Sequence, residues 1–340
     1  MNFIEKHQLY KKKLSATLNK IEDINLAKKR LSYLRWKVSE NLDKLLFEFE
    51  TNVKKTDANV LFAPNIETAI EHLNKHLKPI SKVNFLEHNA IKKMVANGNI
   101  VVPENSEKPD VVLVGAKFLM ANTGNIFIAL NNVQEYQQII NAKKTIIIAG
   151  IDSILASQID LPLAKQLYST YEIGELIYPA EILTRPGKPR GLQTEIVLIL
   201  IDNGRSKLLT NPFHRPLFNL LNFDLAPVCP MHQISEEIPY WKNIDSLSYF
   251  LNPFTTDLDA IKQPIFGNYG FEILNQYLPY DIDLSEHVTE ARSFSNQNEK
   301  KKTVFNSFLD TDKSSIALNA KNFRDKEKFK KYAMHNFFGK

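Results

Sequence analysis

Apolar residues recur every three or four positions through the first part of the chain. This spacing marks one face of an α-helix, and neither Gly nor Pro interrupts it. The pattern predicts one long helix within an N-terminal helical arm over residues 1–58, which lies across a core or a partner. The apolar positions are Ala27, Leu31, Leu34, Val38, Leu42, Leu45, Phe49 and Val53.

From Asn59 the pattern changes to short apolar runs that alternate with helical stretches. Strands that are apolar at every position are covered on both faces. Interleaved with helices, they predict an α/β domain over residues 59–210 with an open, mostly parallel sheet. Ligands bind such sheets at the carboxyl ends of the strands. The predicted strands are Asn59–Ala63, Val111–Gly115, Ile126–Leu130, Thr145–Gly150 and Glu195–Asp202, and the predicted helices are Ile66–Leu77 (capped by Asn65), Leu86–Ala96, Val133–Asn141 and Asp152–Tyr171.

After Thr210 eight prolines break any long element, so residues 211–292 read as an irregular extension wrapped on the domain. Residues 291–340 hold 12 Lys and Arg against 5 Asp and Glu, a net charge of +7, so the preceding 290 residues sum to −2. The tail over residues 293–340 is typical of a solvated, partly disordered end, and it is also suited to docking on an acidic partner. Nucleic acid is disfavoured because the near-neutral body continues no basic track.

The chain has a single cysteine, Cys229, among 340 residues. One thiol excludes an internal disulfide, a Cys-based zinc site and a self-contained iron–sulfur cluster, so we expect neither a metal nor a cofactor. The N-terminus has no apolar signal region, and the longest apolar runs are too short to span a bilayer. A cytoplasmic protein is therefore expected.

The segment from Asp202 to Ser206 follows the strongest predicted strand. Asn203-Gly204 is a turn pair that tolerates positive φ. Such a turn lets backbone N–H groups and the Arg205 guanidinium converge on a carboxylate or phosphate. In the alternative interpretation it is a plain turn whose Arg205 pairs with a structural acid.

Two further loops are candidates for ligand contact. Thr123-Gly124, between two strand-like runs, offers a hydroxyl and a bare backbone, or is simply the turn that joins them. Lys188 and Arg190 lie on a Gly- and Pro-hinged loop that either closes over an anion or is a solvated connector. His72 and His76 have metal-ligand spacing on a helix but lack an accompanying acid, so surface histidines are favoured.

Several stretches resemble the lactate-utilisation (LUD) family, in particular its LutB-type iron–sulfur subunit. They are NLDKLLFEFE at Asn41–Glu50, GAKFLMANTGNIFIAL at Gly115–Leu130 and VLILIDNGRSKLL at Val197–Leu209, within a similarity that spans residues 30–292. The resemblance implies a Rossmann-like sheet of the NagB/RpiA/CoA-transferase type.

The family's iron–sulfur subunit continues into a bacterial ferredoxin pattern, C-x2-C-x2-C-x3-C-P. With Cys229-Pro230 as the last two positions, the other ligand positions hold Asn219, Asn222 and Leu225. In the stretch that resembles the second ligand set, Ser285 and Val288 stand at cysteine positions. The resemblance therefore implies a degenerate ferredoxin-like extension over residues 211–292 that has lost both clusters.

The leading hypothesis is an accessory or substrate-binding subunit in the oxidation of lactate or another 2-hydroxy acid, with an oxidoreductase subunit as partner. Arg205 would hold the carboxylate, and the remaining contacts would come from Thr123, Gly124, Asn203, Gly204, Ser206, Lys188 and Arg190. One alternative is a non-redox transferase or isomerase that acts on a sugar phosphate or acyl thioester through Glu87 or Glu195. The other is a purely structural subunit.

Overall fold

The computed structural model describes residues 3–56, 58, 60–77, 82–86, 109–187, 194–210, 215–223, 275–283 and 286. Its contacts divide the chain into two compact units. The helical unit takes its described residues from Met1–Glu40, Pro162–Ile177 and Ser206–Lys340, and the α/β unit takes them from Asn41–Leu161 and Tyr178–Arg205. In this grouping the residues after Asn41 belong with the sheet, and residues 162–177 and those from Ser206 belong with the helical unit. No helix in the described part of the chain is long and apolar enough to cross a membrane.

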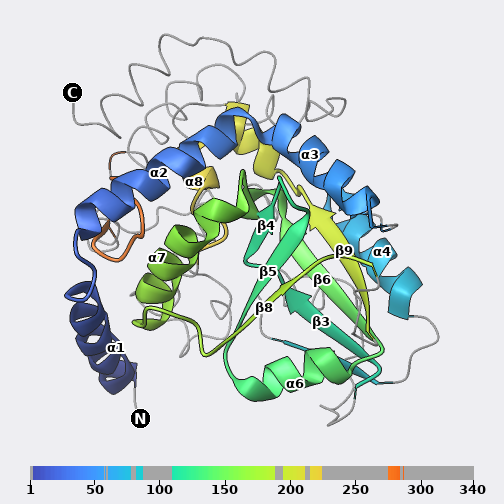
Figure 1. Ribbon diagram of the computed structural model, residues 1–340, viewed down its shortest axis with the longest axis horizontal. Helices are drawn as coiled ribbons and strands as arrows, with labels where there is room; N and C mark the ends of the chain where they lie inside the picture. The colour runs from blue at the N-terminus through green and yellow to red at the C-terminus, as the bar shows by residue number, and fades with distance from the viewer. Residues whose placement is uncertain are drawn as a thin grey trace, which may run out of the picture. The chain divides into compact units, whose positions relative to one another are not determined.

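The α/β unit is built on a five-stranded sheet in which every neighbouring pair is parallel, as the apolar runs predict. Figure 1 shows its central strands β9, β6 and β3 side by side. The sheet order is β1 (Val60–Ala63), β9 (Glu195–Ile201), β6 (Lys144–Gly150), β3 (Val111–Gly115) and β2 (Val83–Phe85).

Helix α4 (Ile66–Leu77) covers one face of this sheet. Its N-terminus is capped as predicted, since the Asn65 Oδ1 accepts a hydrogen bond from the Thr68 N–H at 2.8 Å. Ala69 and Leu73, fully buried on α4, pack with alternate residues of the strands. The strand residues in this core are Ala63, Val83, Val111, Leu113, Ile146, Ile148, Ile199 and Ile201.

A second, four-stranded sheet was not predicted. Its order is β7 (Ile154–Leu155), β4 (Phe118–Met120), β5 (Asn125–Leu130) and β8 (Ala180–Thr184), with two antiparallel pairs and one parallel pair. Only β5 was expected as a strand. Helix α6 (Val133–Asn141) follows β5 with its predicted bounds, and the Asn132 side chain caps it through the Glu135 N–H.

Two predicted helices need correction. The helix expected from Asp152 begins only at Leu161 as α7 (Leu161–Ile173), because a 3₁₀ turn, η1 (Ile151–Ser153), then β7 and a second turn, η2 (Gln158–Asp160), come first. The long N-terminal helix is in fact α2 (Ile24–Glu40) and α3 (Leu42–Lys54), separated at Asn41 with φ −124°. The predicted helix Leu86–Ala96 lies outside the described residues apart from Leu86.

The helical unit consists of α1 (Phe3–Leu18), α2, α7 from Pro162, α8 (Arg215–Phe218) and the segment 275–283. Its centre is polar as well as aromatic. Arg35 is fully buried, and the hydroxyls of Tyr168 and Tyr280 are hydrogen-bonded to each other with their rings edge to face. Burial raises the pKa of Tyr168, so this hydroxyl stays neutral.

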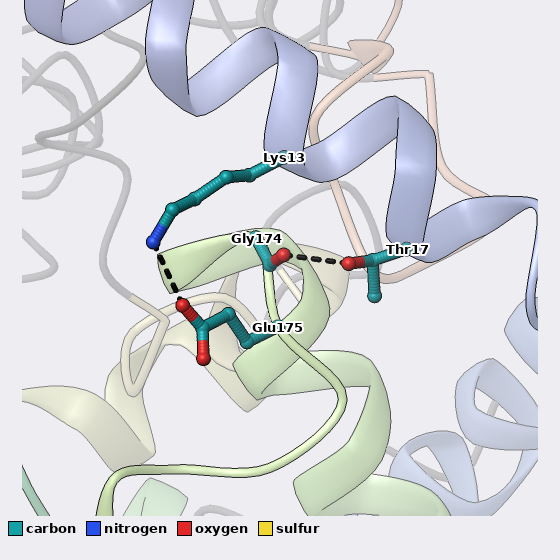
Figure 2. Close-up of polar contacts among 4 residues, drawn as sticks. All are labelled: Lys13, Thr17, Gly174 and Glu175. Atoms are coloured by element: carbon teal, nitrogen blue, oxygen red, sulfur yellow. Dashed lines mark hydrogen bonds and ion pairs between the residues drawn. The ribbon is translucent and has the colours of Figure 1, made fainter.

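Helix α1 attaches to the C-terminal end of α7 through one face (Figure 2). The Tyr10 hydroxyl donates to the Tyr171 carbonyl, and the Thr17 Oγ1 donates to the Gly174 carbonyl at 2.6 Å. Lys13 forms an ion pair with Glu175 at 2.7 Å. The last turn of a helix has carbonyls without partners inside the helix, and α1 supplies a donor to one of them, at Tyr171, and another to the Gly174 carbonyl just past the end of α7.

Gly174→Ala is expected to lower the free energy of unfolding by about 1–2 kcal/mol. Gly174 has φ +74°, and a Cβ at this position would lie 2.9 Å from the Lys13 Cβ, so both the backbone and the contact with α1 suffer. Urea unfolding measures the change. Glu175→Gln is the control, because the pair it breaks is half exposed and contributes under about 1 kcal/mol. Equal effects of the two changes would contradict the prediction.

Candidate functional site

The predicted turn after β9 lies at the carboxyl edge of the parallel sheet. The Asp202 N–H donates to the Ala63 carbonyl and the Asn203 N–H to the Pro64 carbonyl, both at 3.0 Å, so pairing with the β1 side continues past the strand. Asn203 and Gly204 have φ angles of 43° and 82°, and the Arg205 N–H closes the turn on the Asp202 carbonyl at 3.0 Å. Two successive positive φ angles define the type I′ turn, for which Asn-Gly is the preferred pair.

Arg205 is held in place by two hydrogen bonds. Its Nε donates to the Asp152 Oδ1 at 2.6 Å, and its Nη1 donates to the Asp202 carbonyl at 3.0 Å. The Asp152 side chain is 3% exposed and the Arg205 side chain 19% exposed. Asp152 is therefore the buried member of the pair, and Arg205 is the more exposed member.

Gly150 makes room for this ion pair. It ends β6, beside β9 in the sheet, and its φ of −80° suits any residue. A Cβ on Gly150 would lie 2.0 Å from the Asp152 Oδ1 and 2.6 Å from the Arg205 Nε. Only a glycine lets the carboxylate and the guanidinium meet directly above the end of β6.

The Thr123-Gly124 turn joins β4 to β5, as predicted for a plain connection. Gly124 has φ +70°, and a Cβ there would lie 3.1 Å from the Asn52 carbonyl carbon and the Val53 nitrogen of α3. The Asn52 Nδ2 donates to the Ala121 carbonyl at 2.8 Å, which fixes α3 against the turn. Close helix packing thus accounts for Gly124, and Thr123 Oγ1 accepts from the Asn125 N–H at 3.3 Å.

Amide side chains connect this turn with the segment that follows Asp152. Asn122 bonds the Ser157 hydroxyl and the Gln158 N–H, both at 3.0 Å, and the Asn125 Nδ2 donates to the Gln158 Oε1 at 2.7 Å. The Arg185 Nε donates to the Asn125 Oδ1. The segment after β6 therefore binds Arg205 through Asp152, and it binds the turn before β5 through Ser157 and Gln158.

The other predicted site residues do not all lie near Arg205, and some lie outside the described residues. Ser206 is buried and begins the stretch that groups with the helical unit. Lys188 and Arg190 lie outside the described residues, as does Glu87. Glu195 is paired with Lys144 at 3.4 Å at the amino end of β9, opposite the edge that carries Arg205, so it does not join that site.

The two histidines of α4 have different surroundings. His72 Nε2 lies 3.2 Å from the Phe62 carbonyl. Burial and the nearby Lys144 lower the pKa of His76. Across the described residues, no group of three or more His, Cys, Asp and Glu side chains is arranged to hold a metal ion.

Sequence reasoning missed Asp152, Gly150 and the amide network of Asn122, Asn125 and Gln158. Asp152 sits two residues past the end of a buried parallel strand. Because ligands bind at the carboxyl ends of parallel strands, this position alone could have marked Asp152 as a candidate. Its partnership with Arg205, 53 residues later, has no signal in the sequence pattern.

Several curated proteins are similar to this chain over most of its length. Lactate utilization protein B of Bacillus velezensis is 22% identical over 237 residues, which is 68% of this chain and 46% of that protein. Lactate utilization protein B 1 of Bacillus mycoides is 24% identical over 257 residues, 74% of this chain and 50% of that protein. The Bacillus cytotoxicus protein B is 21% identical over 76% of this chain and 66% of its own length. These similarities support membership of the LUD family.

This chain spans about half the length of the first of these LUD relatives. A crystal structure of a DUF162 family protein from Deinococcus radiodurans has a TM-score of 0.34 and 14% identity, and covers 47% of this chain and 98% of that one. No family model matches the sequence.

Proposed function

We propose that the chain is an accessory or substrate-binding subunit in the oxidation of lactate or a related 2-hydroxy acid. Its relatives carry the name lactate utilization protein B. The site supports a ligand with a carboxylate, because a partly exposed arginine stands at the carboxyl edge of a parallel sheet. An oxidoreductase subunit remains the predicted partner.

The observation that carries the proposal is the fixed orientation of Arg205. The buried Asp152 binds Nε, and the Asp202 carbonyl binds Nη1, so neither bond uses Nη2. A guanidinium anchored in this way loses little freedom when it binds a carboxylate, which favours affinity. Asp152 thus acts as a positioning residue, and Arg205 is the proposed ligand contact.

The absence of a cluster is part of the proposal. Asn219 and Asn222 are the described residues at the cluster-ligand positions that the resemblance implies, and amide side chains do not replace thiolates on iron. Asn219 is buried, and its carbonyl accepts from the Tyr168 hydroxyl at 3.5 Å. Cys229, Leu225, Ser285 and Val288 lie outside the described residues.

Arg205→Lys is expected to weaken lactate binding by about tenfold or more while the melting temperature of the free protein changes little. Lysine keeps the charge beside Asp152 but loses the planar fork that binds a carboxylate through two N–H groups. Calorimetric titration with lactate, glycolate and propionate, alongside thermal unfolding, measures both effects.

Arg185→Lys is the matched control, because Arg185 lies in the same unit and bonds Asn125 rather than Asp152. Lactate affinity should survive this change. If Arg205→Lys unfolds the protein, Arg205 is a structural ion-pair residue. If Arg205→Lys binds lactate as well as the original chain does, the ligand site lies elsewhere.

A further inference from the structure

Strand β8 forms one edge of the four-stranded sheet. It pairs with β5 on one side, and no other strand of the described residues pairs with its opposite side. Leu183 on β8 is 49% exposed, although the neighbouring Thr184 is buried. An edge strand that carries an exposed apolar side chain is a template on which a further strand can pair.

The backbone of Leu183 faces the open side of β8. The Phe127 carbonyl of β5 accepts the Lys117 N–H, just before β4, at 2.9 Å, so the backbone groups of Phe127 point towards β4. Leu183 stands opposite Phe127 in the antiparallel pair of β5 and β8. The two residues therefore form a non-hydrogen-bonded pair, and the N–H and C=O of Leu183 point away from β5. Alternation along the strand gives Glu181 and Arg185 the same direction.

Arg185 extends this pattern one residue beyond the strand. The register of β5 and β8, continued by one residue, places Asn125 opposite Arg185, and the Arg185 Nε donates to the Asn125 Oδ1. The open side ends shortly afterwards, because the N–H and C=O of Gly187 bond Ile196 of β9 at 2.8 and 2.7 Å. The open edge therefore runs from Glu181 to Arg185.

The side chains along this edge are complementary to themselves. Glu181, Leu183 and Arg185 are spaced two residues apart, so they lie on the same face of the strand. In a second copy that runs antiparallel about a two-fold axis at Leu183, the two Leu183 side chains stand opposite each other. Each Glu181 then stands opposite Arg185 of the other copy. Apolar pairs and opposite charges at such positions stabilise antiparallel strands.

We propose that the chain forms a homodimer in which the β8 strands of two copies pair antiparallel. The two four-stranded sheets then join into one continuous sheet. This contact is short and lies at the small end of protein interfaces, so we expect a dissociation constant of about 10 μM. Neither Arg205 nor Asp152 takes part, so the dimer does not depend on the proposed ligand site.

Sedimentation velocity of the full chain measures the association. Between about 1 and 200 μM the original chain should change from monomer to dimer. Leu183→Lys places two ammonium groups opposite each other at the axis, so it should weaken association by about tenfold or more. Ile159→Lys is the control, because Ile159 is 85% exposed in the same unit but lies outside β8. This control should associate like the original chain.

Charge reversal provides a second comparison. Arg185→Glu and Glu181→Arg each place like charges opposite each other in their own dimers, so each variant alone should stay monomeric. An equimolar mixture restores both pairs of opposite charges and should associate, with circular dichroism confirming that each variant is folded. The proposal is overturned if the original chain stays monomeric throughout, if Leu183→Lys associates as well as the original chain, or if the mixture of folded variants fails to associate.

Discussion

Gly150→Ala should be the most damaging single methyl group added to the α/β unit. A Cβ on Gly150 would lie 2.0 Å from the Asp152 Oδ1, a separation that no real contact allows. The Asp152 side chain is 3% exposed, so the pair has little room to move aside. We expect the free energy of unfolding to fall by about 3 kcal/mol, because the added methyl group overpacks the site and breaks a buried ion pair. In thermal unfolding this is roughly a 10 °C decrease.

The same substitution should also remove lactate binding, because Arg205 loses its support. A double-mutant cycle with Asp152→Ala separates the causes. If the clash with the carboxylate dominates, Gly150→Ala costs much less stability in the Asp152→Ala background. Equal costs in both backgrounds would mean that the methyl group disturbs the sheet itself, and the proposed role of Gly150 would be wrong.

Four strands of the parallel sheet could be predicted because they are apolar almost throughout and long enough to be recognised, whereas β2, three residues with Asn84 at its centre, was not predicted. β3, β6 and β9 are almost wholly buried, and burial on both faces leaves this signature in the sequence. β4 and β7, with three and two residues, are too short for periodicity to separate them from a loop. Their pairing is set by tertiary contacts.

The break between α2 and α3 was also not predicted from the apolar pattern. The apolar stripe runs through it without a change of spacing, and no Gly or Pro marks it. The two helices group with different units, so each buries its stripe in a different core. Val38, 1% exposed, belongs to the helical unit, and Leu42, 2% exposed, belongs to the α/β unit, although both fit the same apolar spacing.

Half of the candidate site could be predicted, and the missing half is its acidic partner. Asn203-Gly204 predicted the turn, because two successive positive φ angles are adopted most readily by Asn and Gly. Asp152 carries no local signature, and its role depends on β6 and β9 lying side by side. The interpretation in which Arg205 pairs with an acid and the one in which it contacts a ligand turn out to be compatible, because the pair leaves Arg205 partly exposed.

After anaerobic treatment with iron and sulfide, the chain is expected to remain colourless and to hold no stoichiometric iron. A cubane cluster takes four thiolates, and Cys229 is the single cysteine of the sequence. Two copies that shared a cluster would still supply only half the thiolates. Visible absorption, iron content and acid-labile sulfide measure the outcome directly.

A restored ligand set provides the matched control for this prediction. Asn219→Cys, Asn222→Cys and Leu225→Cys together with Cys229 recreate the spacing C-x2-C-x2-C-x3-C-P. If the resemblance has the correct register, this variant should acquire brown colour and iron that the original chain lacks. Iron and acid-labile sulfide in the original chain at cluster stoichiometry would contradict the proposal of a subunit without a cluster. A colourless restored variant would show that this ligand set alone does not hold a cluster, since the fourth cysteine of the pattern ligates the other cluster and the second ligand set is not restored.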